Sequence, residues 1–215
     1  MDTYRTDDEQ AEVLKKWWLE NGRAVVTGIV IGLAVVVGVR YWFQYQKDMS
    51  HKASDLYAKV ESALANNDPA SVLATGQLLL KDYSRTAYAS MAGLAMAKEE
   101  VAAGKNNLAK DHLQWVVDHA DGGLQHTARL RLARLLVNDG KLNEAEALVG
   151  GIKSDGYASA YDELRADIAL AKGNATQARE LYHLALNEGS SGMSRDFLQM
   201  KIDNIAVDNK ATVSK

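Results

Sequence analysis

The chain has no cysteine and only one proline, Pro69, among its 215 residues. The lack of cysteine excludes disulfide bonds, cysteine metal sites and thiol catalysis. A sheet-rich protein with many turns, or a proline-rich linker, would usually contain more proline. Neither sign of charge is in large excess, because the net charge is −3. The sequence therefore lacks the strong positive charge that nucleic-acid binding requires. These absences favour a near-neutral helical protein.

One long uncharged run stands near the start of the sequence, within GRAVVTGIVIGLAVVVGVRYWFQY at 22–45. Sixteen uncharged residues, 24–39, lie between Arg23 and Arg40. As a helix they measure about 24 Å, which is short against a hydrocarbon core of about 30 Å. Arg40 can extend toward lipid headgroups and three aromatic residues follow it, so 24–43 is long enough to span. We predict a transmembrane helix over 24–43.

Two other interpretations of this run remain open from the sequence alone. A cleaved export signal would have a short basic leader, whereas residues 1–23 contain six acids and four bases. The segment after the run, RYWFQYQKDM, is also bulky and charged, unlike a cleavage site. A buried core helix would need a partner surface on every side. We interpret the run as an uncleaved anchor whose orientation is undecided, because each flank has four basic residues.

Small residues recur along the predicted span. Gly28 and Gly32 form a Gly-x-x-x-Gly pair, and Ala34 and Gly38 repeat the spacing. Such pairs let another helix approach closely, so we predict a membrane helix contact, although glycine is also common in membrane helices without one. The leader contains TDDEQAEVLKKWWLE, which is typical of a short amphipathic helix at the membrane surface or of aromatic anchoring beside the span.

The sequence from Gln46 onward has the composition of a helical domain. It contains 20 basic and 22 acidic residues and no sustained two-residue alternation. Clusters of Gly, Asn and Asp, such as NNDP, NDGK and KGN, divide it into roughly eight helices. Asp68 before Pro69 is typical of a helix start, and Ser84 or Thr86 would cap the next helix. We therefore predict an all-α domain.

A repeat appears in three helix pairs. In each pair a glycine is followed five residues later by an alanine: Gly104 and Ala109, Gly140 and Ala145, Gly173 and Ala178. The copies are offset by 36 and 33 residues, close to the tetratricopeptide unit of about 34 residues. The turn of that unit needs a residue that tolerates positive φ, and its second helix needs a small residue where two backbones touch. The spacing predicts a tetratricopeptide-like solenoid over 44–207, with a degenerate first pair at 51–83. An irregular bundle is the alternative, because no copy has the expected early Trp or final Pro.

The remaining candidates concern the surface and end of the array. Four aromatic residues are candidates for partner contacts in the concave groove, or else belong to the core: Trp115, Tyr157, Tyr161 and Tyr182. MSRDFLQMKIDNIAV suits a terminal cap, and 208–215 is expected to be a flexible tail. The five histidines lack the i, i+4 spacing of a metal site, and no nucleophile, base and orienting group occur together. We expect neither an enzyme nor a cofactor or metal.

Several short stretches, taken with the repeat, make the sequence similar to the YfgM family of gamma-proteobacterial inner-membrane proteins. They are KKWW, ENG, RYW, LRLAR, AKG and QMKI, and the resemblance covers about residues 4 to 207. It implies an ancillary subunit of the SecYEG translocon, with a cytoplasmic amino terminus, one anchor and a tetratricopeptide-like domain in the periplasm. It also implies association with PpiD, a membrane-anchored periplasmic chaperone, and a link to envelope stress signalling through RcsB.

These features lead to one main hypothesis and one alternative. The main hypothesis is a scaffold, with a cytoplasmic leader at 1–23, an anchor among membrane lipids at 24–43 and a periplasmic array at 44–207. The array would partner a PpiD-type chaperone at the translocon and assist the biogenesis of secreted or outer-membrane proteins. In the alternative, the cytoplasmic leader regulates envelope stress signalling by binding the response regulator RcsB.

Overall fold

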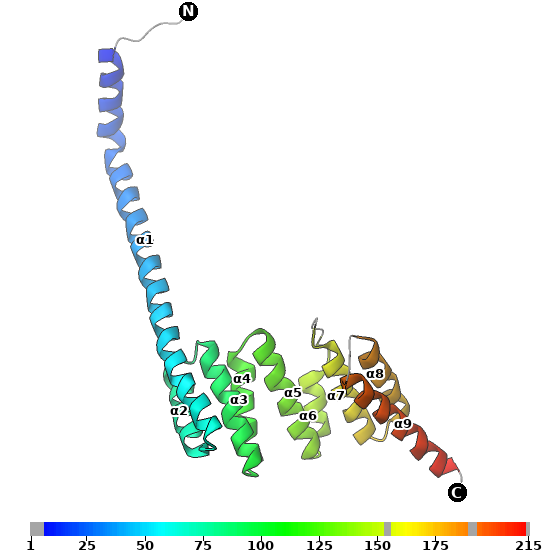
Figure 1. Cartoon of the computed structure of the whole chain (residues 1–215). Helices are drawn as coiled ribbons and strands as arrows, with labels where there is room; N and C mark the ends of the chain where they lie inside the picture. Colours follow the sequence, from blue (N-terminus) through cyan, green and yellow to red (C-terminus); the bar gives the residue numbers. More distant parts are fainter. Residues whose placement is uncertain (1–6, 153–155, 189–192, 214–215) are drawn as a thin grey trace, which may run out of the picture. The chain divides into compact units, whose positions relative to one another are not determined.

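The computed structural model describes residues 7–152, 156–188 and 193–213, and every regular element in these ranges is an α-helix. The elements in chain order (Figure 1) are α1 Asp7–Ala65, α2 Pro69–Asp82, α3 Ala87–Ala102, α4 Asn106–His119, α5 Gly122–Asn138, α6 Leu142–Val149, α7 Ala158–Ala171, α8 Ala175–Asn187 and α9 Met193–Val213. Two compact units divide the chain, one ending at His51 and one starting at Lys52, so their boundary falls inside α1. The predicted all-α class is confirmed.

Helix α1 combines three segments that the sequence presents separately: the leader helix, the span and the first helix of the array. No proline interrupts it, and each glycine inside it costs only about 1 kcal/mol relative to alanine. Between the span and the array, the Gln44 side chain donates to the Asp48 carboxylate at 2.9 Å across one helical turn. Residues 23 and 43, where boundaries are expected, are therefore changes of composition within one continuous helix.

Capping side chains start two helices as the sequence predicts. The Asp68 carboxylate accepts a hydrogen bond from the Ser71 backbone N–H at 3.1 Å, and Pro69 lies in the first turn of α2. The Thr86 hydroxyl accepts one from the Ala89 N–H at 3.3 Å at the start of α3. Each cap satisfies a backbone donor that the helix start leaves unpaired.

The repeated glycines form the turns inside three helical hairpins, α3–α4, α5–α6 and α7–α8. Gly104, Gly140 and Gly173 have φ of 73°, 73° and 84°, a region that side chains disfavour. In each turn the glycine N–H donates to the carbonyl three residues back, and the next N–H donates five residues back, at 2.8–3.0 Å. The alanines that follow the turns are fully buried: Ala109, Ala145 and Ala178.

A first hairpin, formed by the end of α1 and α2, has the same turn without glycine. Asn67 has a φ of 51°, and its N–H donates to the Leu64 carbonyl at 3.2 Å. The Asp68 N–H donates to the Ala63 carbonyl at 2.9 Å, which repeats the bond pattern of the glycine turns. Asparagine tolerates the left-handed region better than most residues, and Val72 takes the place of the packing alanine. The degenerate first pair is therefore a genuine hairpin.

Buried apolar side chains form three clusters along the hairpins, which follow one another in chain order (Figure 1). The first cluster joins the end of α1 to α2 and α3, the second joins α3 through α7, and the third joins α7, α8 and α9. Helix α9 covers the last cluster with Leu198, Ile202 and Ile205, which is the role of a solenoid cap. It continues past Asp208, the expected start of the tail, to Val213.

Candidate interaction surfaces

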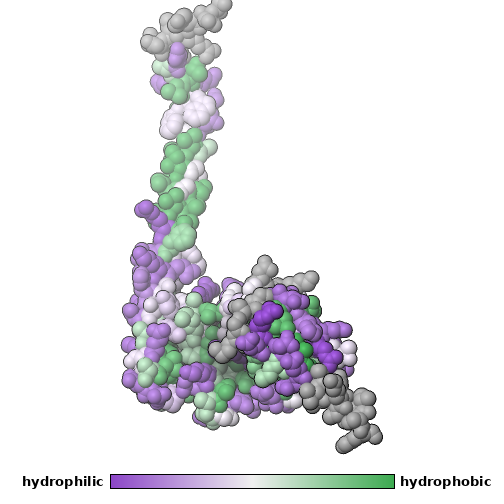
Figure 2. All heavy atoms as spheres, turned by 45° about the vertical axis from the view of Figure 1, so that its right-hand side comes forward, coloured by the Kyte–Doolittle hydropathy of each residue, from purple (hydrophilic) through white to green (hydrophobic). Residues whose placement is uncertain are grey.

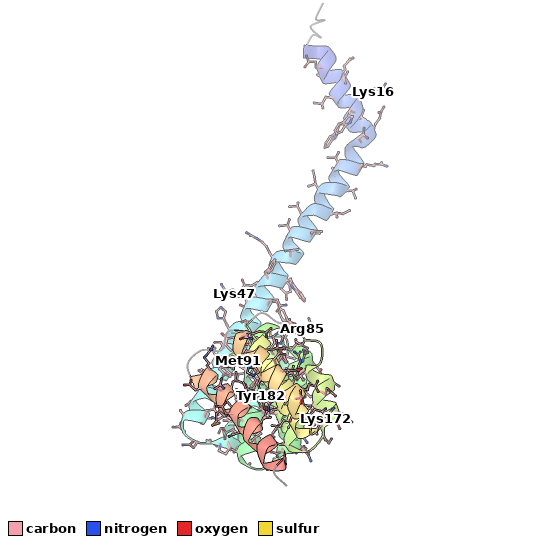
Figure 3. The ribbon with its side chains drawn as sticks, turned by 90° about the vertical axis from the view of Figure 1, so that its right-hand side faces the viewer. Lys16, Lys47, Arg85, Met91, Lys172 and Tyr182 are labelled. Atoms are coloured by element: carbon pink, nitrogen blue, oxygen red, sulfur yellow. The ribbon has the colours of Figure 1, made fainter. Side chains whose placement is uncertain are left out.

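The apolar stretch of α1 is the first candidate surface. It is the one helix in the described residues that is long and apolar enough to cross a membrane. Its side chains are exposed rather than packed in a core, with Leu33 at 61% and Val37 at 66%, and they form a continuous apolar band (Figure 2). Lys16 and Lys47 lie on either side of this stretch (Figure 3). A helix apolar on all sides without a protein cover is suited to lipid, and this is the single transmembrane helix.

The three glycines predicted to contact another membrane helix leave open space on α1. A Cβ atom added at Gly28, Gly32 or Gly38 would meet nothing within 4 Å. Gly28 and Gly32, four residues apart, lie on one side of the helix, whereas Gly38 pairs with Ala34 on another side. No packing among the described residues requires these glycines, so a helix contact at this surface stays a prediction.

The four candidate aromatic residues divide into two buried and two half-buried side chains. Tyr161 and Tyr182 are 0% and 1% exposed, so neither ring is available to a partner, and burial raises the pKa of both phenols. Tyr157 stacks on His126 with ring centres 4.9 Å apart, and the Tyr161 hydroxyl lies 2.8 Å from His126 Nδ1. Trp115, in a different hairpin, stacks on its own helix neighbour four residues on. The structure thus brings Tyr157 and Tyr161 together at His126, packs Trp115 against the same buried cluster and places Tyr182 in the last cluster.

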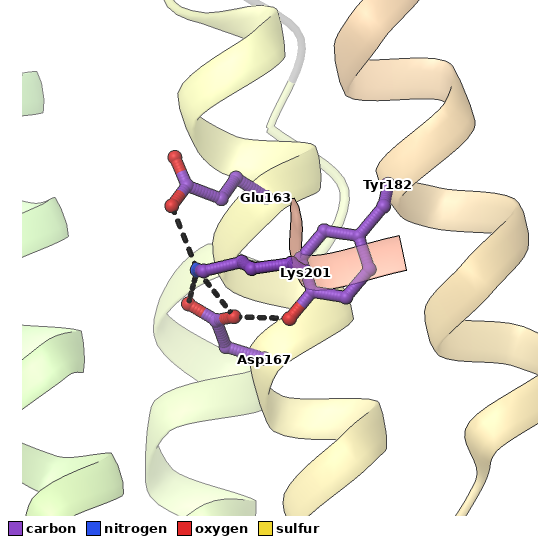
Figure 4. Close-up of polar contacts among 4 residues, drawn as sticks. All are labelled: Glu163, Asp167, Tyr182 and Lys201. Atoms are coloured by element: carbon purple, nitrogen blue, oxygen red, sulfur yellow. Dashed lines mark hydrogen bonds and ion pairs between the residues drawn. The ribbon is translucent and has the colours of Figure 1, made fainter. Parts of the chain in front are cut away.

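Tyr182 belongs to a polar cluster that fastens the terminal helix, which we name the α7–α9 seam (Figure 4). The Lys201 ammonium lies 2.9 Å from the Glu163 carboxylate and 2.8 Å from the Asp167 carboxylate. The Tyr182 hydroxyl donates to Asp167, which together with burial raises the Tyr182 pKa strongly. Lys201 also lies 4.8 Å from the centre of the Phe197 ring. Lys201 forms ion pairs with both carboxylates, so the cluster holds the cap in place.

A second seam, between α3 and α5, forms an open groove of about 280 Å³. Its apolar lining consists of Leu94, Ala97, Val101, Leu113 and Leu135. Its cationic lining consists of three exposed side chains, Lys98 on α3 and Arg131 and Arg134 on α5. None of the ion pairs between described residues involves these three cations. We refer to these eight residues as the α3–α5 groove.

Sequence reasoning did not identify the α3–α5 groove, because its cations come from two hairpins. One signal was available: in RLRLAR, Arg131 and Arg134 are three residues apart and share a helix side, whereas Leu132 and Leu136 face the core. A larger depression of about 690 Å³ over α4, α5 and α6 is lined by both charge signs and offers no such selectivity.

The described residues hold no arrangement typical of catalysis or metal binding. No three His, Asp or Glu side chains cluster within this part of the chain as a metal site requires. The one buried acid–histidine pair is Glu100 and His112, with 3.4 Å between the carboxylate and Nε2. No described nucleophile completes it into a triad.

Comparison with known proteins agrees with the anchor and the hairpins together. The model of the family described as tetratricopeptide repeat-like domain matches residues 15–207. A protein of Escherichia coli (strain K12) named ancillary SecYEG translocon subunit is 29% identical over 210 residues, which cover 96% of this chain and 100% of that one. A protein of the same name from Aggregatibacter actinomycetemcomitans is 31% identical over 202 residues, or 93% and 97% of the two chains. A third, from Haemophilus influenzae, is 26% identical over 200 residues, again 93% and 97%. No solved structure matches the chain. The chain belongs to the YfgM family of ancillary SecYEG translocon subunits and has its tetratricopeptide repeat-like domain.

Proposed function

We propose that this chain is a membrane-anchored scaffold of the SecYEG translocon in the bacterial inner membrane. The observation that carries the proposal is the match to named translocon subunits over 96% of the chain, anchor and array together. The absence of a catalytic cluster among the described residues supports a binding role. The proposed task is to bring a PpiD-type periplasmic chaperone to the translocon, where secreted and outer-membrane proteins emerge.

In this proposal the anchor contacts the translocon and the array faces the periplasm. The open surface at Gly28 and Gly32 supports a helix contact in the membrane, because no described residue fills it. The solenoid supports chaperone binding, because stacked hairpins offer an extended surface to a protein partner. A topology reporter fused after Lys215 tests the orientation. Activity only in the periplasm is expected, and activity only in the cytoplasm would overturn this part of the proposal.

Co-purification in mild detergent at native expression levels tests the scaffold. SecYEG and PpiD are expected to accompany the wild-type chain. Gly28→Ile with Gly32→Ile should reduce SecYEG recovery, because the larger side chains block close helix approach. Val30→Phe with Val37→Phe enlarges the opposite side of the helix and serves as the matched control. A wild-type chain that recovers neither SecYEG nor PpiD would overturn the proposal.

The regulatory alternative places function in the leader instead. In that role the leader would bind RcsB, and deletion of residues 1–20 would abolish the effect on envelope stress signalling. The scaffold role predicts that the same deletion leaves PpiD and SecYEG recovery intact, provided that the anchor still inserts. Membrane fractionation verifies insertion.

A further inference from the structure

We propose that the α3–α5 groove binds a partner segment that has apolar side chains flanked by carboxylates. This inference rests on the proposed function, in which the array is the partner-binding part, and it names the kind of segment that the array recognises. Three observations carry it: an apolar lining that is open to water at Val101, three cations that form no ion pair between described residues, and the size of the groove.

The apolar lining combines a buried base, formed by Ala97, Leu113 and Leu135, with the half-buried Leu94 and the exposed Val101. On α3, Leu94, Ala97 and Val101 follow the i, i+3, i+7 spacing of one helix side. Leu135 on α5 and Leu113 on α4 close the floor between them. Val101 is 43% exposed, so part of the lining is left in water in the array by itself. An apolar side chain of a partner would remove this surface from water.

The cations lie along both edges of this lining. Lys98 follows Ala97 on α3, and Arg131 and Arg134 lie one turn apart on α5. Elsewhere in the array Lys110, Lys172 and Lys201 are paired with carboxylates, whereas the lining of this groove contains three cations and no carboxylate. Two arginines are well suited to carboxylates, because the planar guanidinium can donate two parallel hydrogen bonds. Acidic side chains are therefore the complement that the groove lacks.

The dimensions favour a peptide segment over a small molecule or a lipid. Pockets that enclose small ligands usually measure about 300–1,000 Å³. At about 280 Å³ the groove is below that range and suits one or two side chains of a longer segment. A lipid places its charge at one end of a long apolar chain, whereas this lining is short and has cations on both edges. A peptide with carboxylates on either side of apolar anchors matches that arrangement.

Peptide binding to the full chain in phosphatidylcholine nanodiscs tests the inference. The probe is a fluorescent peptide of alternating leucine and glutamate, followed by fluorescence anisotropy, with empty nanodiscs as the blank. Two matched peptides replace glutamate by lysine or leucine by serine. Binding is expected only for the leucine–glutamate peptide, and it should weaken as sodium chloride rises, because salt screens exposed charges.

Substitutions inside and outside the groove test whether the peptide binds there. Arg131→Gln with Arg134→Gln should weaken binding at least about tenfold, because charge-assisted hydrogen bonds are lost. Arg85→Gln with Arg195→Gln removes two exposed arginines outside the groove and should leave affinity unchanged; Arg85 lies in the loop before α3 (Figure 3). Val101→Ser should weaken binding, whereas Leu108→Ser, equally exposed on α4 outside the groove, should not.

Each contrary outcome overturns the inference. Equal binding of the glutamate and lysine peptides, or unchanged binding by the Arg131→Gln, Arg134→Gln variant, removes the charge argument. Competition by short-chain phosphatidylglycerol, with no loss on changing leucine to serine, assigns the cations to a lipid headgroup. The assay contains no translocon, so the groove can fail here while SecYEG still co-purifies. Conversely, the groove can bind the peptide even where SecYEG is not recovered.

Discussion

The α7–α9 seam and the α3–α5 groove differ in whether their charged side chains form ion pairs. At the α7–α9 seam, Lys201 lies between Glu163 and Asp167, and its charge is neutralised where α9 packs. At the α3–α5 groove, Arg131 and Arg134 have like charge and belong to no ion pair between described residues. Paired charges over a fully buried core close the first seam. Like charges beside the exposed Val101 leave the second open to a partner that brings the opposite charge.

The largest difference between the α7–α9 seam and the α3–α5 groove is expected in the stability lost when an apolar side chain is shortened to alanine. Leu198 under the cap is 2% exposed, and Leu198→Ala should destabilise α9 by about 3 kcal/mol through the cavity it leaves. Val101 at the groove is 43% exposed, and Val101→Ala should cost about 0.5 kcal/mol or less. Hydrogen exchange of the helix amides measures both. Similar losses at the two positions would contradict the comparison.

The next largest loss of stability is expected when the central cation of the α7–α9 seam is removed. Lys201→Met leaves Glu163 and Asp167 facing each other without a counter-ion and should cost about 1–2 kcal/mol, since the group is only partly buried. Lys98→Met in the open groove is the matched control and should change stability by about 0.5 kcal/mol or less. Faster exchange confined to α8 and α9 is expected for the first variant. Equal behaviour of the two lysines would show that the seams do not differ.

The tyrosine of the closed seam predicts a dependence on high pH. Burial and the hydrogen bond to Asp167 raise the Tyr182 pKa above its ordinary value of 10.0. Below pH 10 both the folded and the unfolded chain keep this proton, so the shift has no effect on stability there. Above pH 10 the unfolded tyrosine ionises while the folded one does not, and stability falls as pH rises. Thermal unfolding of wild type and Tyr182→Phe from pH 8 to 11 measures this, and the variant should lose less stability. Parallel curves would contradict it.

The smallest expected effect is the change in the free energy of unfolding when the two arginines of the α3–α5 groove are substituted. Arg131→Gln with Arg134→Gln removes two like charges that belong to no ion pair between described residues. The free energy of unfolding should change by about 0.5 kcal/mol or less, with any gain due to relieved repulsion. Thermal unfolding of the full chain in detergent measures it. A loss of several kcal/mol would mean that the arginines support the fold, as Lys201 does at the closed seam.

The sequence predicts those parts of the fold that depend on neighbouring residues. Gly104, Gly140 and Gly173 meet a local requirement for positive φ, so their turns can be read from spacing alone. Asn67 meets the same requirement with another residue type, so the first hairpin was predicted only as a degenerate pair of similar length, without the glycine and alanine spacing. The continuity of α1 was missed for a similar reason, since a change from apolar to polar composition does not end a helix.

The binding surface is less predictable, because it depends on contacts between hairpins. The sequence spacing at Tyr161 and Tyr182 fits an exposed or a buried side chain equally well. Tyr161 is buried in the cluster of α3 to α7 and Tyr182 in the cluster of α7, α8 and α9, so the packing of the hairpins decides their burial. Lys98 and the arginines of α5 are distant in the sequence and come together only when hairpins stack. Helical spacing identifies each side of the groove, and the stacking determines which sides meet.

The continuous α1 has a consequence for where the array can be cut free of the membrane. Ala53 and Val60 are fully buried in the first cluster, although they belong to the same helix as the anchor. A protease that cleaved between Ala65 and Pro69 would release an array whose first cluster lacks the side chains that α1 contributes. A fragment that starts at Lys52 keeps these α1 side chains, whereas one that starts at Pro69 exposes Val72 and Leu79 to water. Shedding of an intact array therefore requires cleavage on the amino-terminal side of Ala53, close to the end of the apolar stretch.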